Sequence, residues 1–285
     1  MDKFMLEVLP PPLHWNAHKI DDWLSKVVNV LTQTGIRTLN IPEVVEERGP
    51  FERPIPFRPK MAVDEFARRL RDRGVSADFV LNKNTVKTPK VELLRWVEAR
   101  ARRADERKVI FVGAESKFAL STDGMTVLEA TKWAKSRFPN LSIGGIVIFH
   151  RRNEIERVLR KMDAGMEFFV SQIVFELDGL RKFVRMLRQI LGERGLPKIF
   201  VSFGIVMQPK DLQLLDWFGV RIPSHVRSLL DGSENLAEHS IRLVRKMMGE
   251  LMAEMGDEPI GVNLTHLMYQ NIELIVHFDR LLAIS

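Results

Sequence analysis

The stretch SIGGIVIF at residues 142–149 is followed by NEIERVLRKMDA at 153–164 and then by FFVSQIVF at 168–175. The first and third segments are short apolar runs rich in β-branched and aromatic residues, which is typical of buried strands. The middle segment carries opposite charges at i,i+3 and i,i+4 spacing, as an exposed helix does. Together they predict a strand, a helix and a second strand in succession.

The same alternation runs through the whole chain. Strands are predicted at residues 4–9, 36–41, 77–81, 108–112, 142–149, 168–175, 198–205 and 260–267. Helices are predicted at residues 20–34, 64–73, 91–104, 126–138, 153–164, 180–191, 210–218, 236–255 and 272–283, with a short helix after Pro223. Strict alternation implies parallel strands. Eight units in 285 residues favour a closed barrel, which typically takes about 250 residues. We therefore expect one (β/α)8 barrel domain spanning residues 1–285.

The alternative is an open, doubly wound sheet that binds a nucleotide after its first strand. In this chain that position holds Pro10, Pro11 and Pro12, which have no backbone N–H to offer a phosphate. No glycine-rich nucleotide loop of either common type occurs elsewhere. The first turn therefore argues for the barrel.

Composition limits the class of protein. The chain is 45% hydrophobic and 28% charged, which is enough apolar material for a large core. Its longest apolar runs are strand-sized, and its first residues are too short and too acidic for a signal peptide, so a cytoplasmic protein is expected. There is no cysteine, which excludes disulfides, iron–sulfur clusters and thiolate metal sites. The seven histidines show no zinc-binding spacing, and no metal is expected.

The formal net charge is +6. A positive balance favours anionic partners such as nucleotides, phosphates, polyglutamate tails or nucleic acid. The same excess could simply be spread over solvated helix faces. Nucleic acid is not expected, because the basic residues are not interleaved with aromatic ones and no known binding motif occurs.

In a barrel of this class the active site lies where the strands end at their carboxyl side. The polar residues near those predicted ends are Glu7, Asn40, Glu43, Asn82, Lys83, Glu115, Ser116, His150, Arg151, Arg152, Ser171, Gln172, Glu176, Ser202, Gln208, Asn263, Thr265, His266, Tyr269 and Gln270. The set holds acids, amides and bases, but spacing alone identifies no nucleophile–base pair. By themselves these residues indicate an acid-containing mouth that tolerates anions.

Several short motifs are more specific. They are LEVLPP at 6–11, KMDAG at 161–165 with FFVSQ at 168–172, FGIVMQP at 203–209 with GVRIP at 219–223, and Gly261-Val262 in the last strand. In this order and spacing they resemble the methylenetetrahydrofolate reductase family. The resemblance is good from about residue 108 onward and thin between 36 and 107.

The resemblance implies a (β/α)8 barrel that binds FAD at its mouth. The flavin would be reduced by NAD(P)H and would pass hydride to the methylene carbon of methylenetetrahydrofolate or a related pterin. Glu7 matches the acid that protonates the departing nitrogen as the folate ring opens, and its apolar neighbours would raise its pKa. It could instead be an inward strand residue paired with a barrel cation.

The resemblance also suggests residues that bind substrate and cofactor. Gln172 matches the amide that holds the pterin, and Glu115 stands where the family carries an Asp near flavin and pterin. His150, Glu154, Arg157, Arg160 and Lys161 occupy the stretch that binds the cofactor in the family. Arg and Lys suit a pyrophosphate, although residues 154–161 also read as an ordinary charged helix face.

The sequence departs from the family after the fourth strand. VGAES at residues 112–116 stands where the family has Leu-Arg-Gly-Asp, and the long segment 42–60 is rich in Pro, Glu and Arg. These changes concern the binding of FAD more than the role expected of Glu7. They leave open a flavin-free, pterin-binding protein that transfers one-carbon groups, or a non-catalytic subunit of such a complex. A homo-oligomer or a partner subunit is compatible with either.

Overall fold

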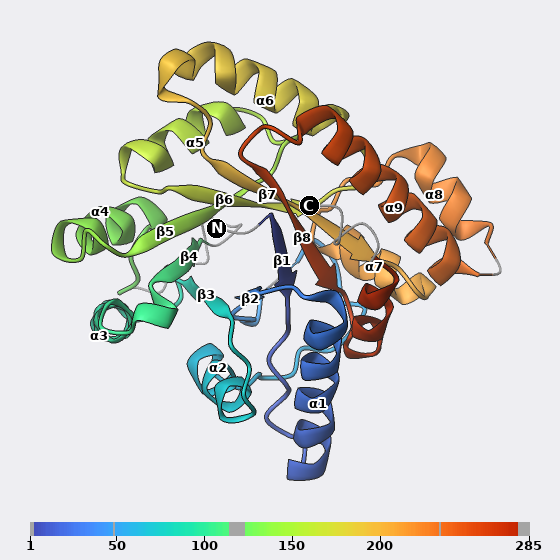
Figure 1. The fold of residues 1–285 in the computed structure, drawn as a ribbon, viewed down its shortest axis with the longest axis horizontal. Coiled ribbons are helices and arrows are strands. Elements are labelled where there is room, and N and C mark those ends of the chain that lie inside the picture. Colours follow the sequence, from blue (N-terminus) through green and yellow to red (C-terminus); the bar gives the residue numbers. More distant parts are fainter. Residues whose placement is uncertain (1–2, 48, 114–122, 234, 279–285) are drawn as a thin grey trace.

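The computed structural model describes residues 3–47, 49–113, 123–233 and 235–278. Its eight strands are all parallel and close into a barrel in chain order, with helices around the outside (Figure 1). The strands are β1 (Phe4–Glu7), β2 (Thr38–Ile41), β3 (Asp78–Asn84), β4 (Lys108–Val112), β5 (Ser142–Val147), β6 (Phe168–Ile173), β7 (Lys198–Ile205) and β8 (Ile260–His266). The predicted (β/α)8 barrel is confirmed.

Helices follow the strands in the predicted order. The α-helices are α1 (Ala17–Thr34), α2 (Val63–Asp72), α3 (Lys90–Ala101), α4 (Val127–Arg137), α5 (Glu154–Asp163), α6 (Asp178–Leu191), α7 (Pro209–Trp217), α8 (Ser224–Asp231) and α9 (Leu236–Met255). The 3-10 helices are η1 (Ala104–Glu106), η3 (Gly192–Arg194) and η4 (Tyr269–Phe278).

Helix ends are set by capping residues. The side chain of Asn16 accepts a 2.9 Å hydrogen bond from the backbone N–H of Lys19, so α1 begins three residues earlier than the apolar pattern predicted. The same helix ends at Gly35, whose φ of 68° is left-handed and therefore favours glycine. In α4, Thr126 and Glu129 form a reciprocal capping box.

The first strand and the last helix end differently from the prediction. The first strand is predicted to run to residue 9 but ends at Glu7, and the N–H of Leu9 donates to the side chain of His266 instead of to a neighbouring strand. The last helix was expected at 272–283, whereas the structure has the 3-10 helix η4 and residues 279–283 lie outside the described part. Asn271 in η4 donates a 3.0 Å hydrogen bond to the carbonyl of Ile205, which holds this segment against the end of β7.

The apolar core has two layers, one between the strands and the helices and one inside the barrel. The inner cluster consists of Met5, Val80, Ile110, Phe168, Val170 and Phe200. Gly144 makes room for one of these rings, since a Cβ there would lie 2.4 Å from Cε2 of Phe168. The barrel interior is therefore a packed plug that closes the end opposite the mouth.

Strand register places a polar layer above this plug. Met5 lies beside Asn263, and two residues further along β1, Glu7 lies beside Thr265 and Asn40. Side chains alternate along a strand, so Glu7 points inward because Met5 does. The acid thus stands at the top of the plug, facing the mouth.

The segment between β2 and α2, residues 42–60, is called the strap below. Its far end forms an antiparallel bridge from Lys60 to Pro12, and the N–H of Leu13 donates a 2.9 Å hydrogen bond to the carbonyl of Pro59. Its start is fixed by Glu43, whose carboxylate accepts 2.6 Å hydrogen bonds from Lys83 Nζ and the N–H of Asn84 in β3. In the described part of the chain, no helix has both the length and the apolar character needed to cross a membrane.

Candidate active site

Glu7 sits at the centre of a polar cluster in the barrel mouth. Its Oε1 accepts a 2.8 Å hydrogen bond from the hydroxyl of Thr265, and its Oε2 accepts from Nδ2 of Asn40 at 3.0 Å and from Nδ2 of Asn263 at 3.3 Å. The same Asn263 amide nitrogen also donates to the hydroxyl of Ser202 at 3.0 Å. The three partners of Glu7 and Ser202 are all buried, whereas residue Glu7 as a whole is partly exposed. The carboxyl is therefore held by three buried side chains.

Burial governs the protonation of Glu7. Desolvation raises the pKa of its carboxyl, and the hydrogen bonds from Thr265 and Asn263 offset only part of that effect. No Lys or Arg of the described residues forms an ion pair with it, so the expected alternative of a barrel cation as partner is not what the structure has. A raised pKa keeps the proton on the carboxyl to higher pH, which suits a group that donates a proton.

Amide oxygens around the acid lack partners. The Oδ1 atoms of Asn40, Asn82 and Asn263, on β2, β3 and β8, are buried and accept no hydrogen bond. A buried polar atom without a partner costs about 1–3 kcal/mol. Three such acceptors on β2, β3 and β8 suit a ligand that brings several N–H donors.

The other half of the mouth is apolar. Val112 on β4 and Ile146 on β5 pack on the inner cluster, and Ile173 on β6 lies 3.2 Å from the point where a Cβ at Gly204 would stand. Polar groups thus come from β7, β8, β1, β2 and β3, while apolar ones come from β4, β5 and β6. A planar heterocycle with one polar edge would match this division.

His266 fixes the rim beside Glu7. Its Nε2 accepts a 3.2 Å hydrogen bond from the N–H of Leu9, and its Nδ1 donates to the carbonyl of Met268 at 3.0 Å. Burial lowers the pKa of the imidazole to about 4, so it stays neutral. This histidine joins the chain after β1 to the end of β8 and so holds Glu7 in register with Thr265.

Gln172 does not join the cluster around Glu7. A register shift between Val170 and Ile173 gives Ile173 the inward position opposite Ser202. Nε2 of Gln172 instead donates a 3.0 Å hydrogen bond to the carbonyl of Phe218, at the end of α7, while its Oε1 is buried without a partner. Its expected role in holding a pterin stays a prediction, with Oε1 as the free acceptor.

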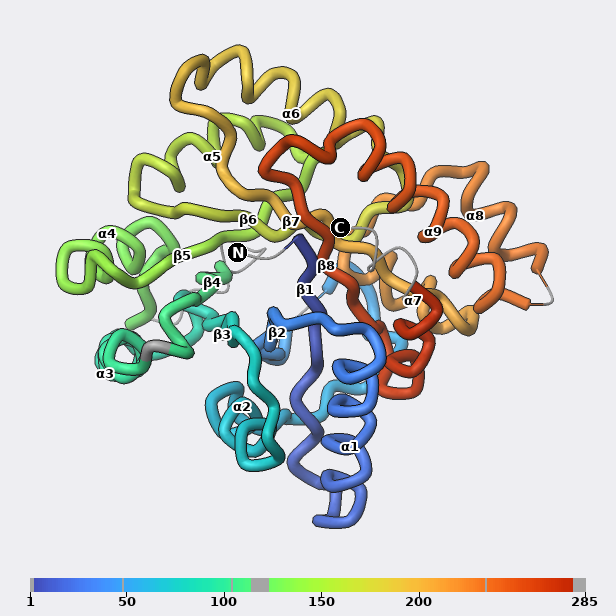
Figure 2. Tube along the Cα trace, in the orientation of Figure 1, coloured from blue at the N-terminus to red at the C-terminus, as the bar shows by residue number. Residues whose placement is uncertain are grey.

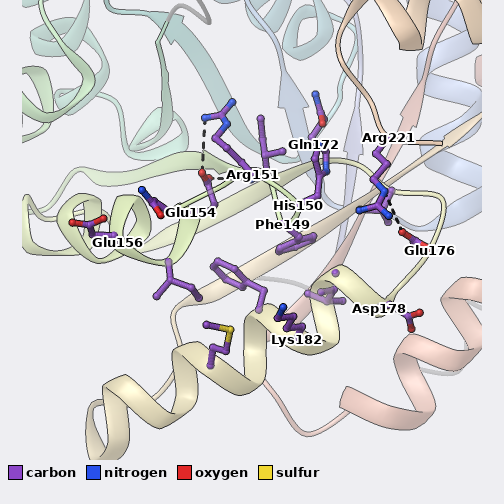
Figure 3. Close-up of a pocket in the computed structure, with 18 of the residues that line it drawn as sticks. Phe149, His150, Arg151, Glu154, Glu156, Gln172, Glu176, Asp178, Lys182 and Arg221 are labelled. Atoms are coloured by element: carbon purple, nitrogen blue, oxygen red, sulfur yellow. Dashed lines mark hydrogen bonds and ion pairs between the residues drawn. The ribbon is translucent and has the colours of Figure 1, made fainter. Parts of the chain in front are cut away.

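Gln172 lines a second hollow, a cleft of about 870 Å³ between α5 and α6 (Figure 3). The side chains of Phe149, Leu159, Phe183 and Met186 give it an apolar floor. His150, Arg151 and Arg221 lie in the upper part of Figure 3, where Arg151 pairs with Glu154 and Arg221 with Glu176, and Lys182 lies below them on α6. Desolvation lowers the pKa of His150, and the charges of Arg221 and Arg151 lower it further.

The structure separates the five residues expected to bind a cofactor. His150 and Glu154 line the cleft. Glu154 is buried and its Oε1 accepts a 3.0 Å hydrogen bond from the N–H of Ile148. Lys161 donates from Nζ to the carbonyl of Ile146 at 2.5 Å, and desolvation lowers its pKa. Arg157 and Arg160 are exposed on α5. Two of the five thus already bind the backbone at the end of β5, and Glu115 lies outside the described residues.

Sequence reasoning named the partners of Glu7 only as strand-end polar residues. Asn40, Asn263 and Thr265 were among the twenty candidates, but nothing separated them from the rest. The signal that could have done so is register, because Asn40 and Thr265 are the lateral neighbours of Glu7 in a parallel barrel closed in chain order. Within the described ranges, no three His, Asp or Glu residues come together as possible metal ligands.

The comparisons with known proteins bear on residues 150–277, which match the model of the family described as methylenetetrahydrofolate reductase. This segment includes α5, Gln172, the cleft and β8. This part of the chain is similar to that family. The LEVLPP motif that carries Glu7 lies outside the matched segment, so the role of the acid rests on the geometry described above and on the resemblance of that motif.

Among solved structures, an uncharacterized protein from Clostridium thermocellum that binds two copies of 5-methyl-5,6,7,8-tetrahydrofolic acid shares the fold, with a TM-score of 0.82. It is 19% identical over 99% of this chain and 96% of that chain. EDTA monooxygenase (EmoA) from Chelativorans sp. BNC1 has a TM-score of 0.53 and 10% identity over 99% of this chain and 95% of that one. No curated protein matches the sequence.

Proposed function

We propose that the barrel mouth binds a reduced folate or a related pterin and that Glu7 is the acid that opens its five-membered ring. The observation that carries the proposal is the Glu7 carboxyl, with its raised pKa, held by Asn40 and Asn263, whose own amide oxygens accept nothing. A pterin offers N–H donors along one edge and an apolar face. The N–H edge would then face the polar half of the mouth, and the apolar face would lie against the apolar half.

The proton of Glu7 has a defined path in this scheme. The neutral carboxyl gives its proton to the nitrogen that leaves the methylene carbon, and the carboxylate that remains accepts hydrogen bonds from Asn40, Asn263 and Thr265. The Thr265 hydroxyl can also accept a hydrogen bond from the protonated acid, because a hydroxyl is both donor and acceptor. The site thus supports both protonation states without moving its backbone.

We further propose that the reaction is a reduction and that the hydride comes from NAD(P)H through FAD. A bound flavin would supply that hydride to the methylene carbon, which would become a methyl group. The exposed guanidinium groups of Arg157 and Arg160 fit a pyrophosphate, and His150 stands at the rim of the nearby cleft. The folate bound by the protein from Clostridium thermocellum supports the pterin half of the proposal.

A second candidate is a flavin-free protein that binds a pterin carrying a one-carbon group. Two of the five residues expected to bind the cofactor, Glu154 and Lys161, instead form hydrogen bonds with the backbone of β5 and the residue after it. This observation favours the flavin-free candidate. In that case Glu7 would still protonate or hold the pterin, and no hydride would pass.

One experiment separates these candidates. The purified protein is mixed with FAD or FMN, freed of excess, and its visible spectrum is recorded before and after NAD(P)H. A retained flavin band that NAD(P)H bleaches supports the reductase. A colourless protein that still binds 5-methyltetrahydrofolate in a titration supports the flavin-free candidate, and failure to bind any reduced folate would overturn both.

A further inference from the structure

The strap contacts elements on both sides of the strands that carry the acid. In the closed barrel β2 and β7 are separated by β1 and β8, the strands that carry Glu7 and Thr265. The strap leaves β2 and reaches the end of α7, where the Nε1–H of Trp217 donates a 3.0 Å hydrogen bond to the carbonyl of Phe51. In Figure 2 the light-blue tube of the strap passes beside α7. The strap then returns to Pro12, in the loop after β1.

Arg53 lies on the part of the strap that contacts Trp217 and Phe218 at the end of α7. Its guanidinium carbon is 4.6 Å from the centre of the Trp217 ring and 5.7 Å from that of Phe218. The Nε atom is buried and has no hydrogen-bond partner. Desolvation lowers the pKa of Arg53, and its ordinary value is so high that the group stays charged.

Lys60 is the last residue of the strap and forms its bridge to Pro12. Its Nζ is 5.1 Å from the centre of the Tyr269 ring, just after β8. Desolvation and then the charge of Arg53 lower the pKa of this amine to about 8. The Tyr269 hydroxyl donates a 2.6 Å hydrogen bond to the carbonyl of Pro10, and burial raises its pKa, so the ring brings no negative charge.

Neither cation has an ion-pair partner within the residues that the structure describes. Glu47 and Glu46 on the strap lie near enough to raise the pKa of Arg53, but burial lowers it more, and Glu47 also pairs with Lys87 at 3.8 Å. Two partly buried positive groups that repel each other are unfavourable unless an anion joins them. The aromatic rings that face these two cations stabilise the positive charges without a carboxylate. Both charges can therefore still interact with an anionic ligand.

We propose that Arg53 and Lys60 form an anion-binding pair on the strap that holds the charged end of the ligand whose ring enters the mouth. The ligand chemistry is a carboxylate or a phosphate on a flexible chain. It is either the glutamate tail of a folate or the phosphates of a nucleotide. The position of the ring rests on the proposed function, whereas the anion site rests on the strap alone.

Binding measurements on matched variants test the pair. Arg53→Gln and Lys60→Gln each remove one charge, and Arg58→Gln removes the same charge from an exposed position on the same strap. Calorimetry gives Kd for the mono- and triglutamyl forms of 5-methyltetrahydrofolate and for ADP. Circular dichroism confirms that each variant is folded, and Lys60→Gln alone suffices should Arg53→Gln unfold.

The glutamate tail is the expected source if Kd for the triglutamate rises about tenfold in the two variants and stays unchanged in Arg58→Gln. That change corresponds to about 1.4 kcal/mol. If Kd rises for ADP instead, the anion that the pair binds is the phosphate of a nucleotide, and this result also supports the pair. The proposed pair is overturned if Kd for neither ligand rises relative to the Arg58→Gln control, or if the wild-type protein binds none of these anions. Loss of folate binding alone, with ADP still sensitive to both variants, would refute only the proposed function.

Discussion

The hydroxyl of Thr265 on β8 donates a 2.8 Å hydrogen bond to Oε1 of Glu7 on β1. This bond lowers the pKa of the carboxyl, against the larger upward effect of desolvation. It also closes the barrel across the seam between its last and first strands. One contact thus joins the fold to the proposed chemistry.

Replacing Thr265 should move the pH profile of turnover. Thr265→Val removes a donor that favours the carboxylate, so the pKa of Glu7 rises further and the acid stays protonated to higher pH. The limb of the profile that falls with increasing pH should shift upward, and Thr265→Ser should restore its position. If the pH profile of Thr265→Val is the same as that of the wild type, the protonation of Glu7 does not control the step that limits turnover.

Replacing Glu7 should stop folate reduction and spare flavin reduction. General acids contribute about 100-fold to 10,000-fold, so Glu7→Gln should lower the rate with methylenetetrahydrofolate by at least about 100-fold. Reduction of the flavin by NAD(P)H should continue, which rapid-mixing absorbance measures. Loss of both half-reactions would argue against a role limited to the folate.

The same variant should be more stable than the wild type at neutral pH. A carboxyl with a raised pKa binds its proton more tightly in the folded than in the unfolded protein, so its contribution is full below the ordinary value of 4.5. That contribution is lost as the pH rises through the folded pKa. Glu7→Gln resembles the neutral acid and should raise the melting temperature at pH 7 to 8, with little difference near pH 4. A stability difference that is the same at both pH values would contradict a raised pKa.

The apolar pattern was sufficient to predict the barrel, and it could not predict the site in detail. Strand alternation predicts that Gln172 shares the inward face with Val170, but the register shift in β6 puts Ile173 there. The apolar pattern does not reveal such a register shift. Gln172 and Ile173 are adjacent, and either side chain is compatible with a half-buried position. Arg53 and Lys60 were missed for another reason. Their partners Trp217 and Tyr269 are far along the chain, and only the folded strap brings them together.

Gln172→Ala should test whether this residue still serves the pterin. The change removes the hydrogen bond to the carbonyl of Phe218, which costs about 1 kcal/mol of stability. If Oε1 holds a pterin, KM for the folate should rise by about tenfold while kcat changes little. Urea denaturation at equilibrium gives the stability change separately, and an unchanged KM would remove the assignment.

Gly144→Ala should destabilise the barrel and leave the mouth intact. The new Cβ would lie 2.4 Å from the ring of Phe168 in the inner cluster, and overpacking of this kind costs about 1–3 kcal/mol. Thermal unfolding should show a lower midpoint, whereas Kd for 5-methyltetrahydrofolate should stay the same in the folded variant. Gly249→Ala is the matched control, because a Cβ there meets nothing within 4 Å.

Lys60 should make ligand binding depend on pH near 8. Its pKa of about 8 is below the ordinary value because of desolvation and the charge of Arg53, which with Tyr269 faces the amine. An anion favours the charged amine and raises this pKa, so binding at pH 8 to 8.5 should take up a proton. Affinity should be greatest below pH 8 and fall as the pH rises above it.

Calorimetry in two buffers of different ionisation enthalpy measures that proton uptake directly. Triglutamyl 5-methyltetrahydrofolate and ADP are the two ligands, titrated at pH 8.3 into wild type and Lys60→Arg. A guanidinium stays charged throughout this range, so the uptake should vanish in Lys60→Arg while affinity becomes independent of pH. Equal uptake in both proteins would assign the proton to another group and would leave Lys60 without a part in binding the anion.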